Sequence, residues 1–211
     1  MYPVTLDVRG RLCVVVGGGN VAARKVESLL EAGARVRLVA PELCAALEGL
    51  AADGTIEHRK RPYAPEDLDG AFLAISATDD RATNEQVSRD ATARGLLVNV
   101  VDVPELCTFQ VPASIRRGSL LITISTGGKS PALSRRIREQ LDATFGEEYA
   151  AFLDLLGELR RHVMNSIASQ SERQRVWEAI LDSDAVALIR EGRADEARRL
   201  MAGIVEADAE R

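Results

Sequence analysis

The fold is decided by residues 14–22, which read Val14-Val15-Val16-Gly17-Gly18-Gly19-Asn20-Val21-Ala22. A buried β-branched run leads into a GxGxxA turn, and a helical pattern follows the turn. In that setting Gly17 allows the tight turn, Gly19 lets a pyrophosphate approach the backbone, and Ala22 permits close helix packing. The helix N-terminus then faces the anion. This context predicts dinucleotide binding, the alternative being a glycine-rich turn without a ligand.

The rest of the first half alternates short apolar runs with helical patterns, which is typical of a parallel sheet covered by crossover helices. Strands are expected at residues 13–16, 36–40, 56–59, 71–76 and 97–101, and helices at residues 21–32, 42–53 and 83–94. The sequence therefore predicts an α/β fold whose N-terminal part, residues 1–111, is a Rossmann domain with a parallel sheet.

The pattern changes after Cys107, where alternating residues around a glycine indicate antiparallel strands. Ser130 and Pro131 then supply an N-cap and a first-turn proline for a helix that can run to about Phe145. Beyond Gly146 the apolar spacing is helical throughout. We expect a central α+β region over residues 112–145 and a helical C-terminal region over residues 146–211.

Composition narrows the class of protein. The 211 residues carry a net charge of -5, which argues against nucleic-acid binding as the main function. The three cysteines are widely spaced without a CxxC pair, which is typical of a reduced cytoplasmic protein that uses them for packing. We expect no export signal and no membrane span. No metal site is predicted, because His58 and His162 lack ligand spacing.

The end of the second strand should hold an acidic residue for the ribose hydroxyls, and only Glu42 is close. Arg37 lies within the strand, so the choice between NAD and its 2′-phosphorylated relative stays open on these residues. Glu42 is explained about equally well as a first-turn residue that complements the helix dipole. In that case the backbone holds the ribose.

Two other strands end at the same edge of the sheet, where cofactor crevices form in open α/β folds. Ala77 and Thr78 follow the fourth strand and are expected to line the nucleotide, whereas Asp79 and Asp80 are better explained as caps of the next helix. Asp102 ends the fifth strand and is the candidate general base. The alternative is a turn residue that bonds its own backbone.

Residues 106–138 contain no acidic residue although the protein as a whole is acidic. Hydroxyls and glycines in this stretch lead into a helix start, which is a second place suited to an anion. We interpret it as a pocket for a polycarboxylate, the alternative being a solvated helix face. The candidate substrate-binding residues are Arg116, Arg117, Ser125, Thr126, Lys129, Ser130 and Arg135.

Further motifs occur in one order over nearly the whole chain. They are Pro3-Val4-x-Leu6, Gly10-Arg11, the glycine turn with Arg24-Lys25, Ala77-Thr78-Asp79-Asp80 with Asn84, Asn99-Val100-Val101-Asp102, Phe109-x-Val111-Pro112-Ala113, Ile124-Ser125-Thr126-Gly127-Gly128-x-Ser130-Pro131 and Glu172-Arg173-x-Arg175-x-Trp177-Glu178. Together they resemble the precorrin-2 dehydrogenase family, which includes the dehydrogenase and ferrochelatase module of bacterial sirohaem synthase.

The resemblance implies oxidation of precorrin-2 to sirohydrochlorin, with NAD as hydride acceptor, in a homodimer whose central region forms the interface. It also implies that Asp102 is essential to catalysis and that the Asn20-Val21 and Pro41-Glu42 positions contact NAD. A regulatory serine of the family falls at Thr126, so phosphorylation control is in doubt. Precorrin-2 carries many carboxylates, which agrees with the acid-free stretch.

Some members of the family also insert iron or cobalt, so Fe(II) or Co(II) as a second substrate is left open. Asp102 could serve both activities. Two other functions remain to be separated from the dehydrogenase: an NAD-sensing Rossmann module without chemistry, and a chelatase with a vestigial dehydrogenase site.

Overall fold

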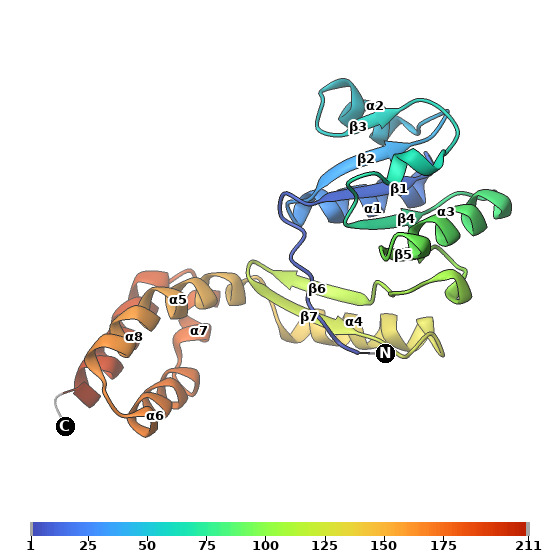
Figure 1. The fold of residues 1–211 in the computed structure, drawn as a ribbon. Helices are drawn as coiled ribbons and strands as arrows, with labels where there is room; N and C mark the ends of the chain where they lie inside the picture. The colour runs from blue at the N-terminus through green and yellow to red at the C-terminus, as the bar shows by residue number, and fades with distance from the viewer. Residues whose placement is uncertain (1, 210–211) are drawn as a thin grey trace. The chain divides into compact units, whose positions relative to one another are not determined.

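The computed structural model describes residues 2–209. The chain divides into two compact units, a first that ends at Val111 and a second that begins at Pro112 (Figure 1). Each unit has its own hydrophobic core, so each is described by itself.

The first unit is built on a parallel sheet of five strands in the order β3-β2-β1-β4-β5. The strands are β1 (Leu12–Val16), β2 (Arg35–Val39), β3 (Glu57–Arg59), β4 (Leu73–Ser76) and β5 (Leu97–Val100). The helices are α1 (Asn20–Glu31), α2 (Ala45–Ala52) and α3 (Arg81–Ala93), with short 3-10 turns at η1 (Pro65–Leu68) and η2 (Pro104–Leu106). The predicted α/β fold with a parallel sheet is confirmed.

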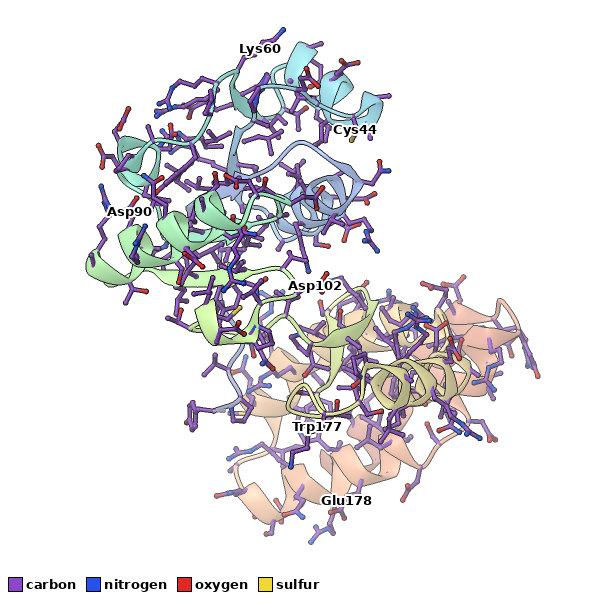
Figure 2. The ribbon with its side chains drawn as sticks, turned by 90° about the vertical axis from the view of Figure 1, so that its right-hand side faces the viewer. Cys44, Lys60, Asp90, Asp102, Trp177 and Glu178 are labelled. Atoms are coloured by element: carbon purple, nitrogen blue, oxygen red, sulfur yellow. The ribbon has the colours of Figure 1, made fainter. Side chains whose placement is uncertain are left out.

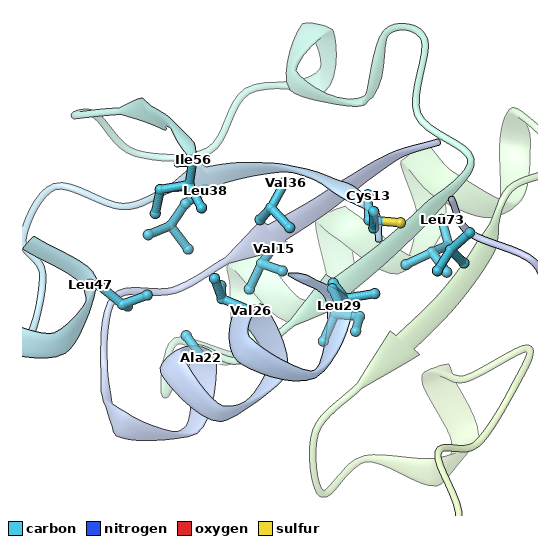
Figure 3. Packing of buried hydrophobic residues seen from close by; sticks show 13 residues of the cluster. Cys13, Val15, Ala22, Val26, Leu29, Val36, Leu38, Leu47, Ile56 and Leu73 are labelled. Carbon is cyan, nitrogen blue, oxygen red and sulfur yellow. The ribbon is translucent and has the colours of Figure 1, made fainter. Parts of the chain in front are cut away.

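The β1 strand separates two layers of core, because successive side chains of a strand point to opposite faces. Cys13 and Val15 pack in the cluster that contains the α1 residues Ala22 and Val26 (Figure 3). Val14 and Val16 pack in the other cluster, which contains the α3 residues Val87 and Ala91. A continuous apolar run is therefore buried on both sides, and it places the turn after β1 at the edge of the sheet.

Two helices of the first unit begin two or more residues away from their predicted starts. The second helix was expected from Glu42 but starts at Ala45, because the Cys44 amide donates to the Gly18 carbonyl (2.8 Å) and holds the preceding loop against the glycine turn. The third helix starts at Arg81, two residues earlier than expected. The Asp80 carboxylate caps it, accepting from the Thr83 amide at 3.1 Å, so the capping interpretation of Asp80 is confirmed.

The second unit opens with the expected antiparallel pair, β6 (Ala113–Arg117) and β7 (Leu120–Ile124). Ser130 caps α4 (Pro131–Thr144) by accepting from the Leu133 amide (3.2 Å), as its position before Pro131 predicted. Four helices follow: α5 (Glu148–Ser166), α6 (Gln170–Leu181), α7 (Ala185–Arg190) and α8 (Ala194–Ala209). They share a core that includes Phe152, Leu155, Val163, Val176, Ile180, Ala197 and Met201.

One helix of this unit is not used for its core. Every residue of α4 keeps solvent exposure, and Leu133 is 49% exposed. Along the part of the chain that the structure describes, no helix has both the length and the apolar character needed to cross a membrane.

Candidate functional site

The glycine turn between β1 and α1 is a packing junction. Gly17 is buried with φ of +124°, and a Cβ atom there would overlap the backbone carbonyl of Ala77, in the loop after β4. A Cβ atom at Gly18 would overlap the carbonyl of Glu42, in the loop after β2. Both glycines are therefore required so that the loops after β2 and β4 can reach the turn.

Gly19 differs from the other two because its surroundings are open. It is exposed, it forms the N-cap of α1 with φ of -87°, and no atom lies within 4 Å of the place where its Cβ would be. No side chain caps this helix end. The first amides of α1, those of Asn20 and Val21 included, lack intrahelical acceptors and are available to a bound anion. The geometry fits the pyrophosphate of a dinucleotide.

The buried side chain of Asn84 stabilises the loop after β4. Ser76 donates from Oγ to Asn84 Oδ1 (2.7 Å), and Asn84 Nδ2 donates to the carbonyl of Thr78 (2.9 Å). Ala77 and Thr78 follow β4, as predicted, and are half-buried beside the glycine turn, and their contact with the nucleotide stays a prediction. Asn84 had no predicted role, and the sequence signal that could have found it is a polar residue at helical spacing with Val87 and Ala91 on the buried face of α3.

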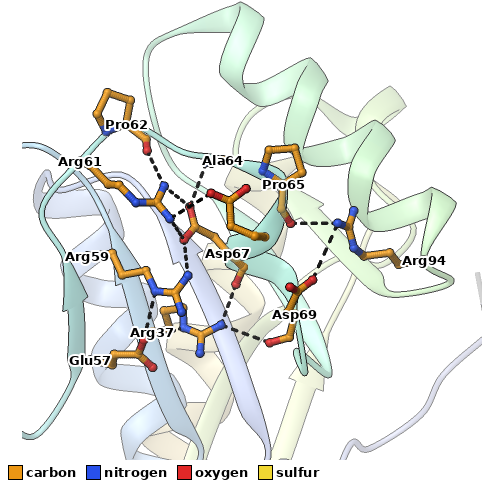
Figure 4. A network of polar contacts seen from close by, with 11 residues as sticks. Arg37, Glu57, Arg59, Arg61, Pro62, Ala64, Pro65, Asp67, Asp69 and Arg94 are labelled. Atoms are coloured by element: carbon orange, nitrogen blue, oxygen red, sulfur yellow. Dashed lines mark hydrogen bonds and ion pairs between the residues drawn. The ribbon is translucent and has the colours of Figure 1, made fainter.

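Pro41 and Glu42 lie at the end of β2 and are exposed. Arg37, the cation within that strand, is fully engaged (Figure 4). Its guanidinium donates to Glu57 Oε1 (2.9 Å) and to the carbonyls of Asp67 (2.9 Å) and Asp69 (3.2 Å), and its side chain is 12% exposed. Arg37 is thus part of the support of the sheet and is not a free cation at the end of β2.

Asp102 lies in a strained turn directly after β5 (Figure 2). The Val103 amide donates to the Val100 carbonyl (3.3 Å), which closes a β-turn with Asp102 as its third residue. Asp102 has φ of +61°, and among the described residues it is the sole non-glycine with a positive φ. The left-handed conformation costs about 1–2 kcal/mol for a residue with a Cβ atom, although aspartate tolerates it better than most. Strain of this kind concentrates at functional sites, and here it carries an exposed carboxylate.

Lys25 supplies a positive charge near this carboxylate. It lies on α1 next to Val26, and Val26 shares a hydrophobic cluster with Val101, the residue before Asp102. Burial lowers the pKa of Lys25, the neighbouring charge of Arg24 lowers it further, and the negative charge of Asp102 raises it. The sequence analysis noted Lys25 only within the Arg24-Lys25 motif and gave it no role.

The second unit carries the candidate substrate residues. Gly127 and Gly128 both have positive φ (+61° and +80°), which folds the loop before α4. Thr126 Oγ1 donates to the Ser130 carbonyl (3.1 Å), accepts from the Ser130 amide (3.2 Å), and lies 3.2 Å from the Ser134 hydroxyl. Ser125 Oγ accepts from the Gly127 amide (3.2 Å). The hydroxyl groups of Ser125 and Thr126 therefore form hydrogen bonds within the loop, which stabilise its conformation.

The predicted cations of this unit fall into two groups. Arg116, Lys129 and Arg135 are exposed. Arg117 is only 14% exposed on its side chain, where Nη2 donates to Asp142 (2.7 Å) and Nε lies 3.3 Å from Glu147. Arg117 therefore joins β6 to α4 and to the start of α5, a contact that the acid-free stretch did not reveal because both carboxylates lie beyond it.

Across residues 2–209, no three histidine, cysteine or acidic side chains come together as a metal site. His58 lies 3.0 Å through Nε2 from the Ala40 carbonyl at the end of β2. His162 lies on α5.

The sheet order and the open glycine turn define a Rossmann-type nucleotide-binding protein, and comparison with known families agrees. Residues 4–113 match a family model described as putative NAD(P)-binding. Residues 117–144 match the central region of sirohaem biosynthesis proteins, and residues 148–203 match the sirohaem synthase dimerisation region.

Individual relatives narrow the class further. The chain is 38% identical over 208 residues to siroheme synthase of Methylobacillus flagellatus and 40% identical over 197 residues to that of Photorhabdus laumondii. The two matches include 99% and 93% of this chain. They include only 44% and 42% of the length of the relatives, so the chain spans less than half of each. The solved structure of SirC, a precorrin-2 dehydrogenase, matches with a TM-score of 0.78 and 31% identity, over 96% of this chain and 100% of that one. The chain belongs to the precorrin-2 dehydrogenase family, the family predicted from its motifs.

Proposed function

We propose that this protein oxidises precorrin-2 to sirohydrochlorin and transfers the hydride to NAD, as a step in sirohaem formation. The observation that carries the proposal is the match to SirC, because it extends over the whole of that dehydrogenase. The reaction removes two electrons and two protons from the macrocycle. NAD accepts a hydride, which is both electrons and one proton, so one proton remains for a base.

The open end of α1 is the place for the cofactor. The amides of Gly19, Asn20 and Val21 would hold the pyrophosphate, since no side chain of the protein occupies that helix end. Pro41 and Glu42 would contact the ribose, and Ala77 and Thr78 would line the nucleotide. Arg37 bonds Glu57 and the carbonyls of Asp67 and Asp69, so we do not propose it as a ligand for a 2′-phosphate, and we propose NAD as the cofactor.

Asp102 is the residue that we propose as the base. Its carboxylate follows the carboxyl end of β5, at the edge of the sheet where the glycine turn follows β1. An exposed carboxylate at that edge can take the proton that the hydride transfer leaves behind. The strained backbone at Asp102 supports a functional role over the alternative of an ordinary turn residue.

The substrate would be held by charge. Arg116, Lys129 and Arg135 are exposed and can pair with carboxylates, and Ser125, Thr126 and Ser130 lie in the loop beside Lys129. Arg117 was predicted as part of this set and stays in it as a prediction, although it already donates a hydrogen bond to Asp142 and forms an ion pair with Glu147.

We also propose that the protein is a homodimer in the cytoplasm. The match to a dimerisation region supports a dimer, but it covers residues 148–203, which follow the central region, residues 112–145, where we predicted the interface. The exposed Leu133 on α4 is apolar surface in that central region and supports the predicted place. The three free cysteines suit a reducing compartment.

Metal insertion is a second candidate activity, favoured by the name of the curated relatives, because sirohaem contains iron. Fe(II) or Co(II) would then be a substrate, and Asp102 would take the pyrrole protons that the metal displaces. Addition of either metal to sirohydrochlorin without NAD tests this activity separately. Unchanged absorbance with both metals would exclude the metal-insertion activity and leave only the dehydrogenase activity.

The decisive experiment incubates the purified protein with precorrin-2 and NAD and follows sirohydrochlorin and NADH by absorbance. We expect equal amounts of the two products. Asp102→Ala should lower kcat at least about 100-fold while NAD affinity is retained, because general-base catalysis contributes about that much. NAD binding without any turnover of the wild-type protein would favour the sensing module instead.

A further inference from the structure

The segment after η2 returns to β5 and runs along its outer edge. The Thr108 amide donates to the Val98 carbonyl (2.8 Å), and the Val98 amide donates to Thr108 Oγ1 (2.8 Å). This return places Cys107 beside the turn that contains Asp102. The backbone and the side chain of Thr108 therefore both attach the segment to Val98 on β5.

The Cys107 thiol bonds both ends of the Asp102 turn. Its sulfur accepts from the Val100 amide (3.1 Å), and its S–H lies within reach of the carbonyls of Val100 (3.2 Å) and Val103 (3.3 Å). Val100 and Val103 are the first and last residues of the turn. A thiol has one proton, so it donates to one carbonyl at a time or is shared between the two.

Asn99 fixes the thiol from the other side. It is 9% exposed, and its Nδ2 donates to the Phe109 carbonyl (3.1 Å) and lies 3.6 Å from the Cys107 sulfur. The amide thus ties the last residues of β5 to the residues on either side of Thr108. Two polar side chains, buried or half-buried, converge on one short turn.

The strained backbone of Asp102 needs contacts that stabilise it, and the contacts of Cys107 and Asn99 can supply them. A left-handed residue persists only where its surroundings over-determine it, and the single 3.3 Å bond from Val103 to Val100 is a weak closure. Without further contacts the turn could open by separation of Val103 from Val100, which would move the carboxylate. The Cys107 contacts oppose that opening because they bond both Val100 and Val103.

We propose that Cys107, supported by Asn99, is a positioning residue that fixes Asp102 in its left-handed turn for proton transfer. The proposal rests on the proposed function in giving Asp102 the role of base. Cys107 touches no reacting atom and acts through the turn. Its role differs from that of Cys13, which is fully buried and packs in the core, where burial raises its pKa to about 11.

Three variants of the 211-residue chain test this inference. Cys107→Ala removes every thiol contact, Cys107→Ser keeps a donor and an acceptor, and Thr108→Val is the matched control because it removes a bond of the same segment at Val98 without touching the Asp102 turn. We expect Cys107→Ala to lower kcat about 10-fold or more with KM for precorrin-2 within about twofold, since a misplaced catalytic group loses rate rather than binding. Cys107→Ser should recover most of kcat, and Thr108→Val should lower the unfolding midpoint without lowering kcat.

A second measurement does not depend on activity. In a crystal structure of Cys107→Ala, Asp102 should leave the left-handed region or adopt more than one conformation. An unchanged φ at Asp102, or a kcat that falls equally in Cys107→Ala and Thr108→Val, would overturn the inference. A wild-type protein without turnover would overturn the proposed function, and the conformation of Asp102 in the variant would still decide whether Cys107 positions it.

Discussion

The carbonyl oxygen of Ala77 occupies the space that a Cβ atom at Gly17 would need. The contact is with backbone, so no rotation of a side chain can relieve it. Gly18 stands in the same relation to Glu42, whereas Gly19 faces open space. The three glycines therefore have different roles. Gly17 and Gly18 allow the neighbouring loops to pack against the turn, and Gly19 leaves open space for a ligand.

Substitutions in the glycine turn should separate these roles. We expect Gly17→Ala to lower the free energy of unfolding by about 3 kcal/mol or more, because it combines a backbone overlap with a φ that alanine disfavours. Gly19→Ala should change it by less than about 1 kcal/mol. Gly19→Asp should fold but lose NAD binding through like charge at the pyrophosphate. Urea unfolding and NAD titration measure both effects, and a Gly17→Ala protein of wild-type stability would contradict the packing role.

Lys25→Met tests the charge next to Asp102. Burial lowers the pKa of Lys25, which means that the charged amine disfavours the fold, so its removal should leave stability unchanged or raise it by up to about 1 kcal/mol. Since the charge of Lys25 interacts with that of Asp102, Lys25→Met should also lower kcat with precorrin-2. Arg24→Met is the control, because Arg24 is exposed on the same helix. If the two variants have the same kcat, Lys25 has no special influence on the base.

Asp67 is a completely buried carboxylate under the second and third strands. It accepts from Arg59 (2.7 Å), Arg61 (2.8 Å) and the Ala64 amide (2.9 Å). Asp67→Asn should lower the free energy of unfolding by about 2–3 kcal/mol, because two arginines each lose a buried carboxylate partner while they keep partial contact with water and with Glu57 or Glu66. Asp69→Asn, at a side chain 70% exposed, should change it by less than about 0.5 kcal/mol. Equal effects in a urea titration would show that burial is not the deciding factor.

The Cys13 thiol should make stability depend on alkaline pH. Burial raises its pKa from 9.0 to about 11, so between these values the unfolded chain releases a proton that the folded chain keeps. Stability should therefore fall as pH rises from 9 toward 11, by about 2–3 kcal/mol in total. The pKa of Tyr63 is also raised by burial and adds a fall of the same sign. Cys13→Ala should remove the thiol part, which unfolding at pH 8 and pH 10.5 would measure as a shallower decline.

The elements that the sequence predicted best are those whose burial is local. The run Val14–Val16 is apolar on both faces, which requires a central parallel strand, and Ser130-Pro131 marks a helix start by itself. The helix from Glu42 was misplaced because the Gly18 carbonyl takes the Cys44 amide, a contact between distant residues that no pattern within one segment shows.

The candidate site was predictable where a residue follows a strand, and not where it depends on a neighbour. Gly19 and Asp102 were placed from their positions after β1 and β5. The left-handed turn at Asp102 could not be predicted, because no glycine occurs at that position. Cys107 was interpreted as a packing residue, because the sequence does not distinguish a thiol that bonds the backbone from one that packs in a core. The contacts of Arg117 with Asp142 and Glu147 were not predicted, because both carboxylates lie beyond residues 106–138.

The hydrogen bonds between Thr108 and Val98 also bear on whether the edge of the sheet can pair with a strand of another molecule. Open sheets can recruit strands from other molecules wherever an edge leaves its amides and carbonyls unpaired. Here one edge strand has hydrogen-bonding groups already taken by its own chain, and the opposite edge, β3, is three residues long. The segment that shapes the turn of Asp102 therefore also protects the sheet from aggregation by edge pairing.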